Sequence, residues 1–169
     1  MHFYSLQSGS HGNCLLVESN GTMVLFDAGI SGAKVERRLR AVGVDVRSVA
    51  AVIVSHDHRD HVQCAGILAR KFGLPVFMTE TTYRAADARV NLGRIDRLRH
   101  FSSGETLQFG HLRVETIRTP HDAADGVAFV VDDGCRRLGI LTDLGHPFPG
   151  LDGVLESLDA VLLESNYDP

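Results

Sequence analysis

Seven consecutive residues carry the clearest chemical signal in this chain. Residues 55–61 contain three histidines in the order His-x-His-x-Asp-His. His56 and His58 alternate, so an extended or looped backbone turns both imidazoles toward one point. Asp60 and His61 follow at the start of a predicted helix, so their side chains point in a slightly different direction. Neutral imidazole and carboxylate groups bind zinc, manganese or iron(II). This one segment can therefore supply ligands to two neighbouring metal positions.

Two simpler interpretations compete with a hydrolytic metal site. The histidines can belong to a surface loop, although a plain polar loop has no need for this order of residues. They can also form a structural zinc site. Such sites are usually closed and rich in thiolates, and no cysteine lies within residues 55–61. The pattern therefore favours a site that does chemistry.

The elements on either side place this cluster at the end of a strand. Residues 49–55 are a nearly continuous apolar run, which predicts a strand buried on both faces. Residues 62–72 predict a helix. The residues expected on its buried face are Cys64, Ile67, Leu68 and Phe72. Open α/β sheets bind their ligands where strands end and helices begin.

A hydrolytic site needs further ligands, and two later residues are candidates. His121 follows the predicted strand 112–119, and Asp143 ends the apolar run 138–142. Each is thus a polar residue at the carboxyl end of a strand. Taken alone, His121 suits an ordinary loop and Asp143 suits a turn, but the first cluster makes both candidate metal ligands.

The His-x-His-x-Asp-His cluster, a later lone histidine and a later lone aspartate together resemble the metallo-β-lactamase superfamily. Residues 25–29 (Leu-Phe-Asp-Ala-Gly) are similar to its early aspartate motif. In that motif Asp27 would buttress the metal loop without binding metal. The stretches that further resemble the YycJ-type branch of this superfamily are residues 8–13, 27–32, 121–124, 142–143 and 164–166.

The resemblance implies a fold and a set of ligands. The fold class would be α/β (α+β), a four-layered αβ/βα sandwich of mixed sheets, with residues 1–169 as a single domain whose C-terminal part is incomplete. His56, His58 and His121 would hold one metal. Asp60 and His61 would hold the second metal, and Asp143 would bridge the two. The further histidine that the superfamily supplies to the second metal is not found.

The resemblance also implies an activity. Two divalent ions, with zinc favoured and manganese or iron as alternatives, would share a bridging hydroxide that attacks the substrate. Asp60 would orient this nucleophile and accept its proton. We expect a phosphodiesterase that acts on DNA as an exonuclease. One alternative is a hydrolase of small esters, thioesters or lactones. Another is a non-catalytic, incomplete metal-binding fragment.

The other histidines divide into two groups. His146 lies three residues after Asp143 and is a candidate for the missing ligand, while His11 is a candidate for the entrance of the site. His2, His100 and His111 lie in or beside predicted strands, and we expect them to be structural or exposed.

Composition limits the possible partners. The 169 residues carry a net charge of −4, which gives no global attraction to nucleic acid. Two basic clusters are candidates for contacts with a phosphate backbone, although each also suits a solvated surface. They are Lys34, Arg37, Arg38 and Arg40, and then Arg94, Arg97 and Arg99.

Cysteine usage and hydropathy predict a cytoplasmic protein. Cys14, Cys64 and Cys135 are an odd number of widely spaced cysteines, so we expect reduced, buried thiols. No apolar run approaches the roughly 20 residues that a membrane span requires. The N-terminus has no signal-peptide pattern.

The remaining pattern predicts an antiparallel edge, βαβ units and a second set of short strands. Asn20-Gly21 predicts a hairpin between residues 14–18 and 23–26. The two further helices are expected at 31–42, with Ser31 as N-cap, and at 79–92, with Thr79 or Thr81 as N-cap. The other strands are expected at 2–7, 76–79, 98–101, 106–109, 112–119, 127–131, 136–142 and 160–164, the last of them buried. An incomplete C-terminal layer would leave an apolar edge that a second copy of the chain can cover.

Overall fold

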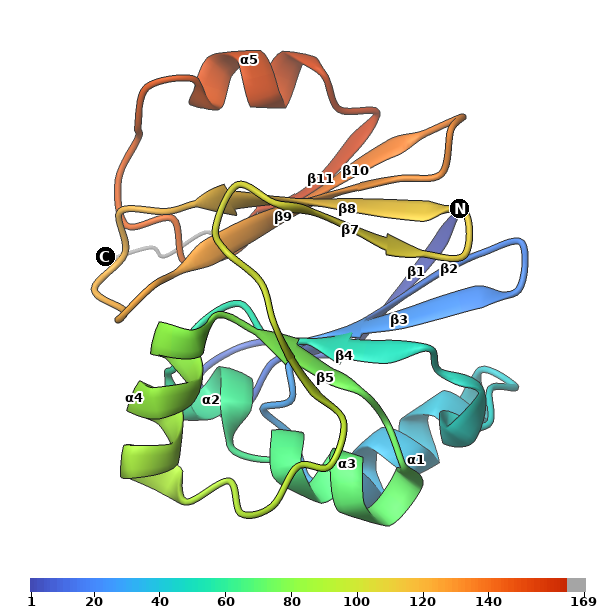
Figure 1. The fold of residues 1–169 in the computed structure, drawn as a ribbon. Coiled ribbons are helices and arrows are strands. Elements are labelled where there is room, and N and C mark those ends of the chain that lie inside the picture. The colour runs from blue at the N-terminus through green and yellow to red at the C-terminus, as the bar shows by residue number, and fades with distance from the viewer. Residues whose placement is uncertain (164–169) are drawn as a thin grey trace.

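Two β-sheets pack face to face between helices in the computed structural model of this chain, which describes residues 1–163 (Figure 1). The strands of the first sheet, in their order across it, are β1 (His2–Gln7), β2 (Cys14–Ser19), β3 (Thr22–Phe26), β4 (Ala51–Ile53), β5 (Val76–Met78) and β6 (Leu98–His100). Those of the second sheet are β11 (Ala160–Leu163), β10 (Arg137–Leu141), β9 (Val127–Asp132), β8 (Leu112–Arg118) and β7 (Thr106–Phe109).

Helices cover the outer face of each sheet. The helices on the first sheet are α1 (Gly32–Ala41), α2 (Arg59–Val62), α3 (Ala65–Phe72) and α4 (Glu80–Val90), with a short 3₁₀ turn at Val46–Ser48. Helix α5 (Leu151–Glu156) lies over the second sheet, at the top of Figure 1. The four-layered αβ/βα sandwich is thereby confirmed. None of the helices in the described residues is long and apolar enough to cross a membrane.

Both sheets are mixed, as expected. Strands β1, β2 and β3 pair antiparallel, whereas β3, β4, β5 and β6 pair parallel. In the second sheet β7 to β10 are antiparallel and β11 joins β10 in parallel. The predicted hairpin is present: Asn20 and Gly21 adopt φ values of 47° and 80°, the positive values that a two-residue type I′ turn requires.

Three separate apolar layers hold the sandwich together. One lies between the first sheet and its helices, and its largest buried side chains include Leu16, Leu39 and Leu68. A second lies between the sheets, where the rings of Phe26 and Phe129 pack 5.1 Å apart. A small third layer lies beneath α5 and includes Leu151. The parallel strands, buried on both faces, carry the continuous apolar runs that the sequence showed.

One predicted helix is broken in the structure. The helix expected from residue 62 to 72 is divided into α2 and α3 at Gln63 and Cys64. There the Cys64 N–H donates to Ala28 O (2.9 Å) and the Gln63 amide donates to Gly29 O (2.5 Å). The break changes the helical phase, so Ile67 is 43% exposed and does not lie on the buried face as predicted.

Three other expectations were wrong in detail. Strand β11 is exposed at the edge of its sheet, with Leu163 at 55% exposure, because β10 covers only one of its sides. Cys135 is exposed in the turn between β9 and β10, whereas Cys14 and Cys64 are buried free thiols as predicted. Helix α5 was not predicted, since Gly150 and Gly153 interrupt its short apolar pattern. Residues 164–166, part of the resemblance, lie outside the described residues.

Candidate metal centre

Two overlapping groups of side chains can each hold a metal ion. His56, His58 and His121 offer nitrogens that all lie within 4.8 Å of one another. His56, His61 and Asp143 form a second group by the same measure. The first group is the predicted ligand set of the first metal. The second contains the predicted His61 and Asp143, with His56 between the two groups.

Strand ends bring these residues together. His56 and His58 follow β4, and His61 lies in the short helix α2. His121 follows β8 and Asp143 follows β10, and both of these strands belong to the second sheet. The backbone of Val127 at the start of β9 donates to Ser55 O (3.1 Å), which joins the two sheets beside the cluster.

The distances suit shared ligation. His58 Nδ1 and His121 Nε2 lie 3.2 Å apart, close to the edge of about 3.3 Å of a tetrahedron with zinc–nitrogen bonds of about 2.0 Å. The two oxygens of Asp143 face different histidines. Oδ2 lies 3.2 Å from His61 Nε2, and Oδ1 lies 3.8 Å from His121 Nε2. This carboxylate therefore spans the two groups.

Asp60 lies at the edge of the second group. Its Oδ2 is 3.5 Å from His61 Nε2, and the carboxylate is partly exposed. It does not belong to either of the two groups whose ligand atoms all lie within 4.8 Å of one another. Asp60 is thus adjacent to the second position and open to the cavity described below.

His56 supplies the test of whether a metal fits. The residue is 2% exposed, and its Nε2 has no hydrogen-bond partner among the described residues. A buried nitrogen left unpaired costs about 1–3 kcal/mol. Burial, followed by the charge of His61, lowers the pKa of His56 to about 3, which keeps the imidazole neutral. A neutral, unpaired nitrogen close to the donor groups of four other residues suits a metal ligand.

Asp27 orients the histidines from behind. Its Oδ2 lies 2.7 Å from His61 Nδ1, and its Oδ1 accepts hydrogen bonds from the backbone N–H and hydroxyl of Ser55, both at 2.8 Å. Ser55 Oγ lies 2.9 Å from His56 Nδ1. Because the hydroxyl proton is directed to Asp27, His56 Nδ1 is the donor in this contact. Both imidazoles are thereby left with Nε2 toward the centre.

Burial and the neighbouring carboxylates have opposite effects on the pKa of His61. Burial alone would lower the pKa of His61, but the carboxylates of Asp27, Asp143 and Asp60 outweigh it and raise this pKa to about 9. The paired imidazolium in turn lowers the pKa of Asp27, against the effect of burial. A metal cation bound at this position would replace the extra proton of His61 and would neutralise the surrounding carboxylates in its place.

Asn13 is a component of the site that sequence reasoning missed. Its Nδ2 donates to Asp60 Oδ2 (3.1 Å) and lies 2.9 Å from His61 Nε2. Its Oδ1 accepts from the Gly9 N–H (2.9 Å), and its own N–H donates to Asp60 O (2.7 Å). The glycine-rich loop of residues 8–13 marked this position in the sequence, but only the fold brings it to α2.

The remaining histidines lie outside both groups. His146, the candidate for the missing ligand, is exposed, and its Nδ1 lies 2.9 Å from Pro147 O. His11 is exposed, with its backbone oxygen bonded to Gln7 (3.0 Å). His2, His100 and His111 are exposed, as expected.

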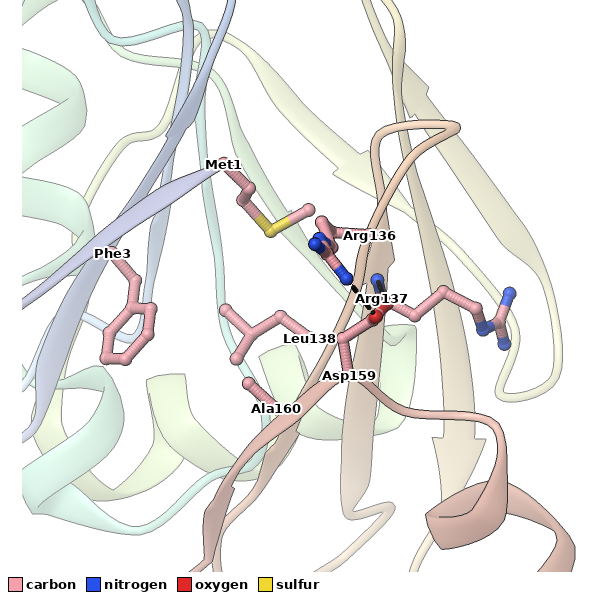
Figure 2. A pocket seen from close by; sticks show the side chains of 7 residues that line it. All are labelled: Met1, Phe3, Arg136, Arg137, Leu138, Asp159 and Ala160. Carbon is pink, nitrogen blue, oxygen red and sulfur yellow. Dashed lines mark hydrogen bonds and ion pairs between the residues drawn. The ribbon is translucent and has the colours of Figure 1, made fainter.

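A cavity of about 660 Å³ opens beside the second group. Its walls include Asp143 of that group, together with Asp60, Asn13, the glycine-rich loop and residues of β11. A separate groove of about 270 Å³ contains none of the candidate ligands (Figure 2). Figure 2 shows apolar side chains such as Phe3 and Leu138 there, beside the ion pair of Arg136 and Asp159 (2.7 Å). The cavity beside the metal centre is therefore the candidate substrate site.

Residues 8–165 match the family described as the metallo-beta-lactamase superfamily. Exodeoxyribonuclease YycJ of Bacillus anthracis is 34% identical over 168 residues, which cover 99% of this chain and 64% of that protein. Exodeoxyribonuclease WalJ of Streptococcus pneumoniae serotype 2 is 33% identical, over 96% of this chain and 61% of that protein. The chain spans less than two thirds of the length of these curated relatives.

Solved structures show the same fold at low identity. A B3 metallo-beta-lactamase with an active-site glutamic acid has a TM-score of 0.72 at 16% identity, over 95% of this chain and 74% of that one. MEM-A1, a subclass B3 metallo-beta-lactamase from a soil metagenome library, has a TM-score of 0.71 at 19% identity, over 95% and 75% of the two chains.

Proposed function

The chain belongs to the metallo-beta-lactamase superfamily, and we propose that it is a metal-dependent phosphodiesterase that degrades DNA as an exonuclease. The observation that carries this proposal is the position of Asp143, whose two oxygens face His61 and His121 in different ligand groups. Paired metal positions occur in phosphatases, polymerases and nucleases, where the two ions stabilise the attacking and leaving oxygens of the phosphate ester. The names of the two exodeoxyribonuclease relatives support DNA as the substrate.

The proposed ligand set draws on the two groups of side chains and adds Asp60, which lies 3.5 Å from His61 beside the second group. His56, His58 and His121 would hold the first ion, Asp60 and His61 would hold the second, and Asp143 would be shared between the two positions. The family and the His/Asp clusters support divalent metal ions. We propose two ions per chain, and zinc in preference to manganese or iron, because imidazole nitrogens dominate the first group.

The chain's own residues prepare this site for an anion. Two divalent ions, when bound, supply an activated water and draw the phosphate oxygens into place. Asp60 and Asp143 offset only half of the charge of such a pair, so the site retains an attraction for a phosphodiester. Asp60, which is partly exposed beside the cavity, orients the attacking water and accepts its proton. Asp27 holds His61 in register from the buried side.

Long-range attraction to DNA contributes little. The net charge is −4, and several arginines in the two basic clusters are already engaged. Arg40 pairs with Glu36 (3.6 Å), Arg94 pairs with Asp96, and Arg97 donates to Gly73 O (3.1 Å). We therefore expect modest salt dependence, set mainly by the phosphate contacts of the metal site.

The direct test compares linear with covalently closed circular duplex DNA. The purified chain, loaded with Zn²⁺ or Mn²⁺, is incubated with both substrates and the products are separated by length. We expect progressive shortening of the linear duplex and an intact circle. Asp60→Ala should abolish the activity without unfolding the protein. His111→Ala changes an exposed histidine outside both ligand groups and should leave the activity intact.

Three other outcomes would contradict the proposal. Cleavage of the closed circle would show endonuclease action. Turnover of a neutral ester or lactone that is indifferent to salt, without DNA cleavage, would favour a small-molecule hydrolase. One metal or none per chain, with no hydrolysis of either substrate, would favour an incomplete metal-binding fragment.

A further inference from the structure

Asp57 lies between two proposed ligands, and its carboxylate contacts residues outside both ligand groups. It separates His56 from His58 in the sequence, at a bend of the chain after β4. The side chain is 0% exposed. Aspartate is almost never fully buried unless it is paired, so its partners indicate what it does.

Each oxygen of Asp57 contacts a different segment. Oδ1 accepts a hydrogen bond from the backbone N–H of Ala124 (2.9 Å). Oδ2 accepts one from Arg89 Nη1 of α4 (2.5 Å), and the Arg89 side chain is 58% exposed. The carboxylate therefore joins the segment of His56 and His58 to the segment that follows His121.

Residues 119–126, here named the His121 loop, carry the third ligand of the first group. The loop is closed at its base by the bond from Thr119 N–H to Gly126 O (3.0 Å). Thr82 of α4 donates to Asp125 O (3.1 Å). Between these anchors, Asp57 is bonded to the loop three residues after His121. This bond ties the His121 loop to the residue that directly precedes His58.

We propose that Asp57 is a positioning residue for the first metal, which fixes the His121 loop against the His56–His58 segment through the Ala124 N–H. This inference rests on the proposed ligand set of His56, His58 and His121. The Arg89 contact has a different task, since it neutralises a buried carboxylate and so supports the fold.

Substitutions at Asp57 and at Arg89 distinguish the positioning of the His121 loop from the neutralisation of the buried carboxylate. Removing the carboxylate frees Arg89 to solvent, to which it is already exposed, and releases the loop. Removing Arg89 leaves Asp57 bonded to Ala124 but unpaired in the interior, which is the more costly change for stability. Asp57→Ala should therefore affect metal affinity more than stability, and Arg89→Met should do the reverse.

The experiment measures metal binding and unfolding without any DNA substrate. Zn²⁺ affinity is measured by competition with a chromophoric chelator, Co²⁺ coordination by visible absorption, and stability by urea unfolding of the metal-free protein. Asp57→Ala should weaken the first ion by on the order of tenfold or more and alter the Co²⁺ spectrum. Asp57→Asn should lose less affinity, because its amide oxygen still accepts from Ala124.

Two further variants keep the test decisive. Ala124→Pro removes the N–H that donates to Asp57, and residue 124 is exposed. This variant should reproduce the loss of Zn²⁺ affinity even if Asp57→Ala does not fold. Asp133→Ala, which removes hydrogen bonds in the turn after β9, should lower stability and leave Co²⁺ binding unchanged. Wild-type affinity and spectrum in Asp57→Ala or Ala124→Pro would overturn the inference, as would an equal affinity loss in Arg89→Met. None of these outcomes depends on whether the substrate is DNA.

Discussion

The Oδ2 atom of Asp27 lies 2.7 Å from Nδ1 of His61, and both side chains are buried. The same carboxylate bonds Ser55, which contacts His56. One buried charge thus orients two candidate ligands, His56 and His61, which both belong to the second ligand group. Asp27 has a φ of 63°, which is unusual for a residue other than glycine. This strained backbone lies where the contacts to His61 and Ser55 converge.

Asp27→Asn should weaken the second metal by on the order of ten- to a hundredfold. The amide can keep the contact with Ser55 through its oxygen, but its NH₂ then faces His61. His61 Nδ1 becomes an acceptor, so the proton moves to Nε2 and blocks the metal position. Titration with Co²⁺, followed by visible absorption, measures this loss. Asp87→Asn is the matched control, because Asp87 Oδ1 only accepts from the Leu92 N–H (2.9 Å). Unchanged second-site affinity in Asp27→Asn would contradict the tautomer argument.

Gly29→Ala should destabilise the fold severely, by more than about 4 kcal/mol. A Cβ at this position would lie 1.6 Å from the backbone oxygen of Asp60, which cannot move without displacing α2. Gly153→Ala is the control, since a Cβ there meets no atom within 4 Å, and alanine should stabilise α5 by up to about 1 kcal/mol. Urea unfolding of the metal-free variants measures both changes. A stable Gly29→Ala variant would show that the contact between residues 29 and 60 is looser than described.

With two ions per chain, as proposed, His121→Ala should lose one of them. The variant removes a nitrogen of the three-histidine group and leaves His61 and Asp143 in place. Metal analysis by mass spectrometry after exhaustive dialysis measures the stoichiometry. His111→Ala, whose imidazole lies 3.4 Å from Thr22 Oγ1 on the surface, should retain both ions. Loss of metal from His111→Ala would mean that the third histidine is assigned wrongly.

Asn13→Ala should weaken the second ion more than the first. The variant removes the donor to Asp60 Oδ2 and leaves that carboxylate less firmly oriented. We expect a loss on the order of tenfold in affinity at the second position. Ser10→Ala changes the same loop at a residue whose hydroxyl lies 3.5 Å from His11 Nδ1, and it serves as the control. Equal weakening of both ions would instead indicate that the whole loop had collapsed.

Asp133 should make stability depend on pH in the acid range. Burial would raise its pKa, but hydrogen bonds from Ser19, Arg136 and Cys135 outweigh this and hold the pKa well below its usual value. A depressed pKa contributes stability that is complete above the unfolded value of about 3.9 and is lost as the pH falls further. The difference in unfolding free energy between wild type and Asp133→Asn should therefore narrow between pH 5 and pH 2. A constant difference would contradict the assignment.

Local patterns predicted most of the elements. The Asn20-Gly21 turn and the N-caps at Ser31 and Thr79 occur as expected, with the Ser31 hydroxyl accepting from the Lys34 N–H and Thr79 from Thr82. These features depend on neighbours within a few residues, so the sequence specifies them directly. The break between α2 and α3 was not predicted, because its cause is a hydrogen bond to Ala28, far away in the chain.

The amino-acid sequence alone indicates the types of the candidate ligands, their order along the chain and the strand ends that carry them, because spacing and hydrophobic pattern are local properties. It is the fold that brings His121 and Asp143 to the histidine cluster, adds Asn13 and leaves His146 outside. It also decided which way Asp27 and Asp57 face. These relations depend on how two sheets pack, and side chains from separate strands share no local pattern that encodes their distance.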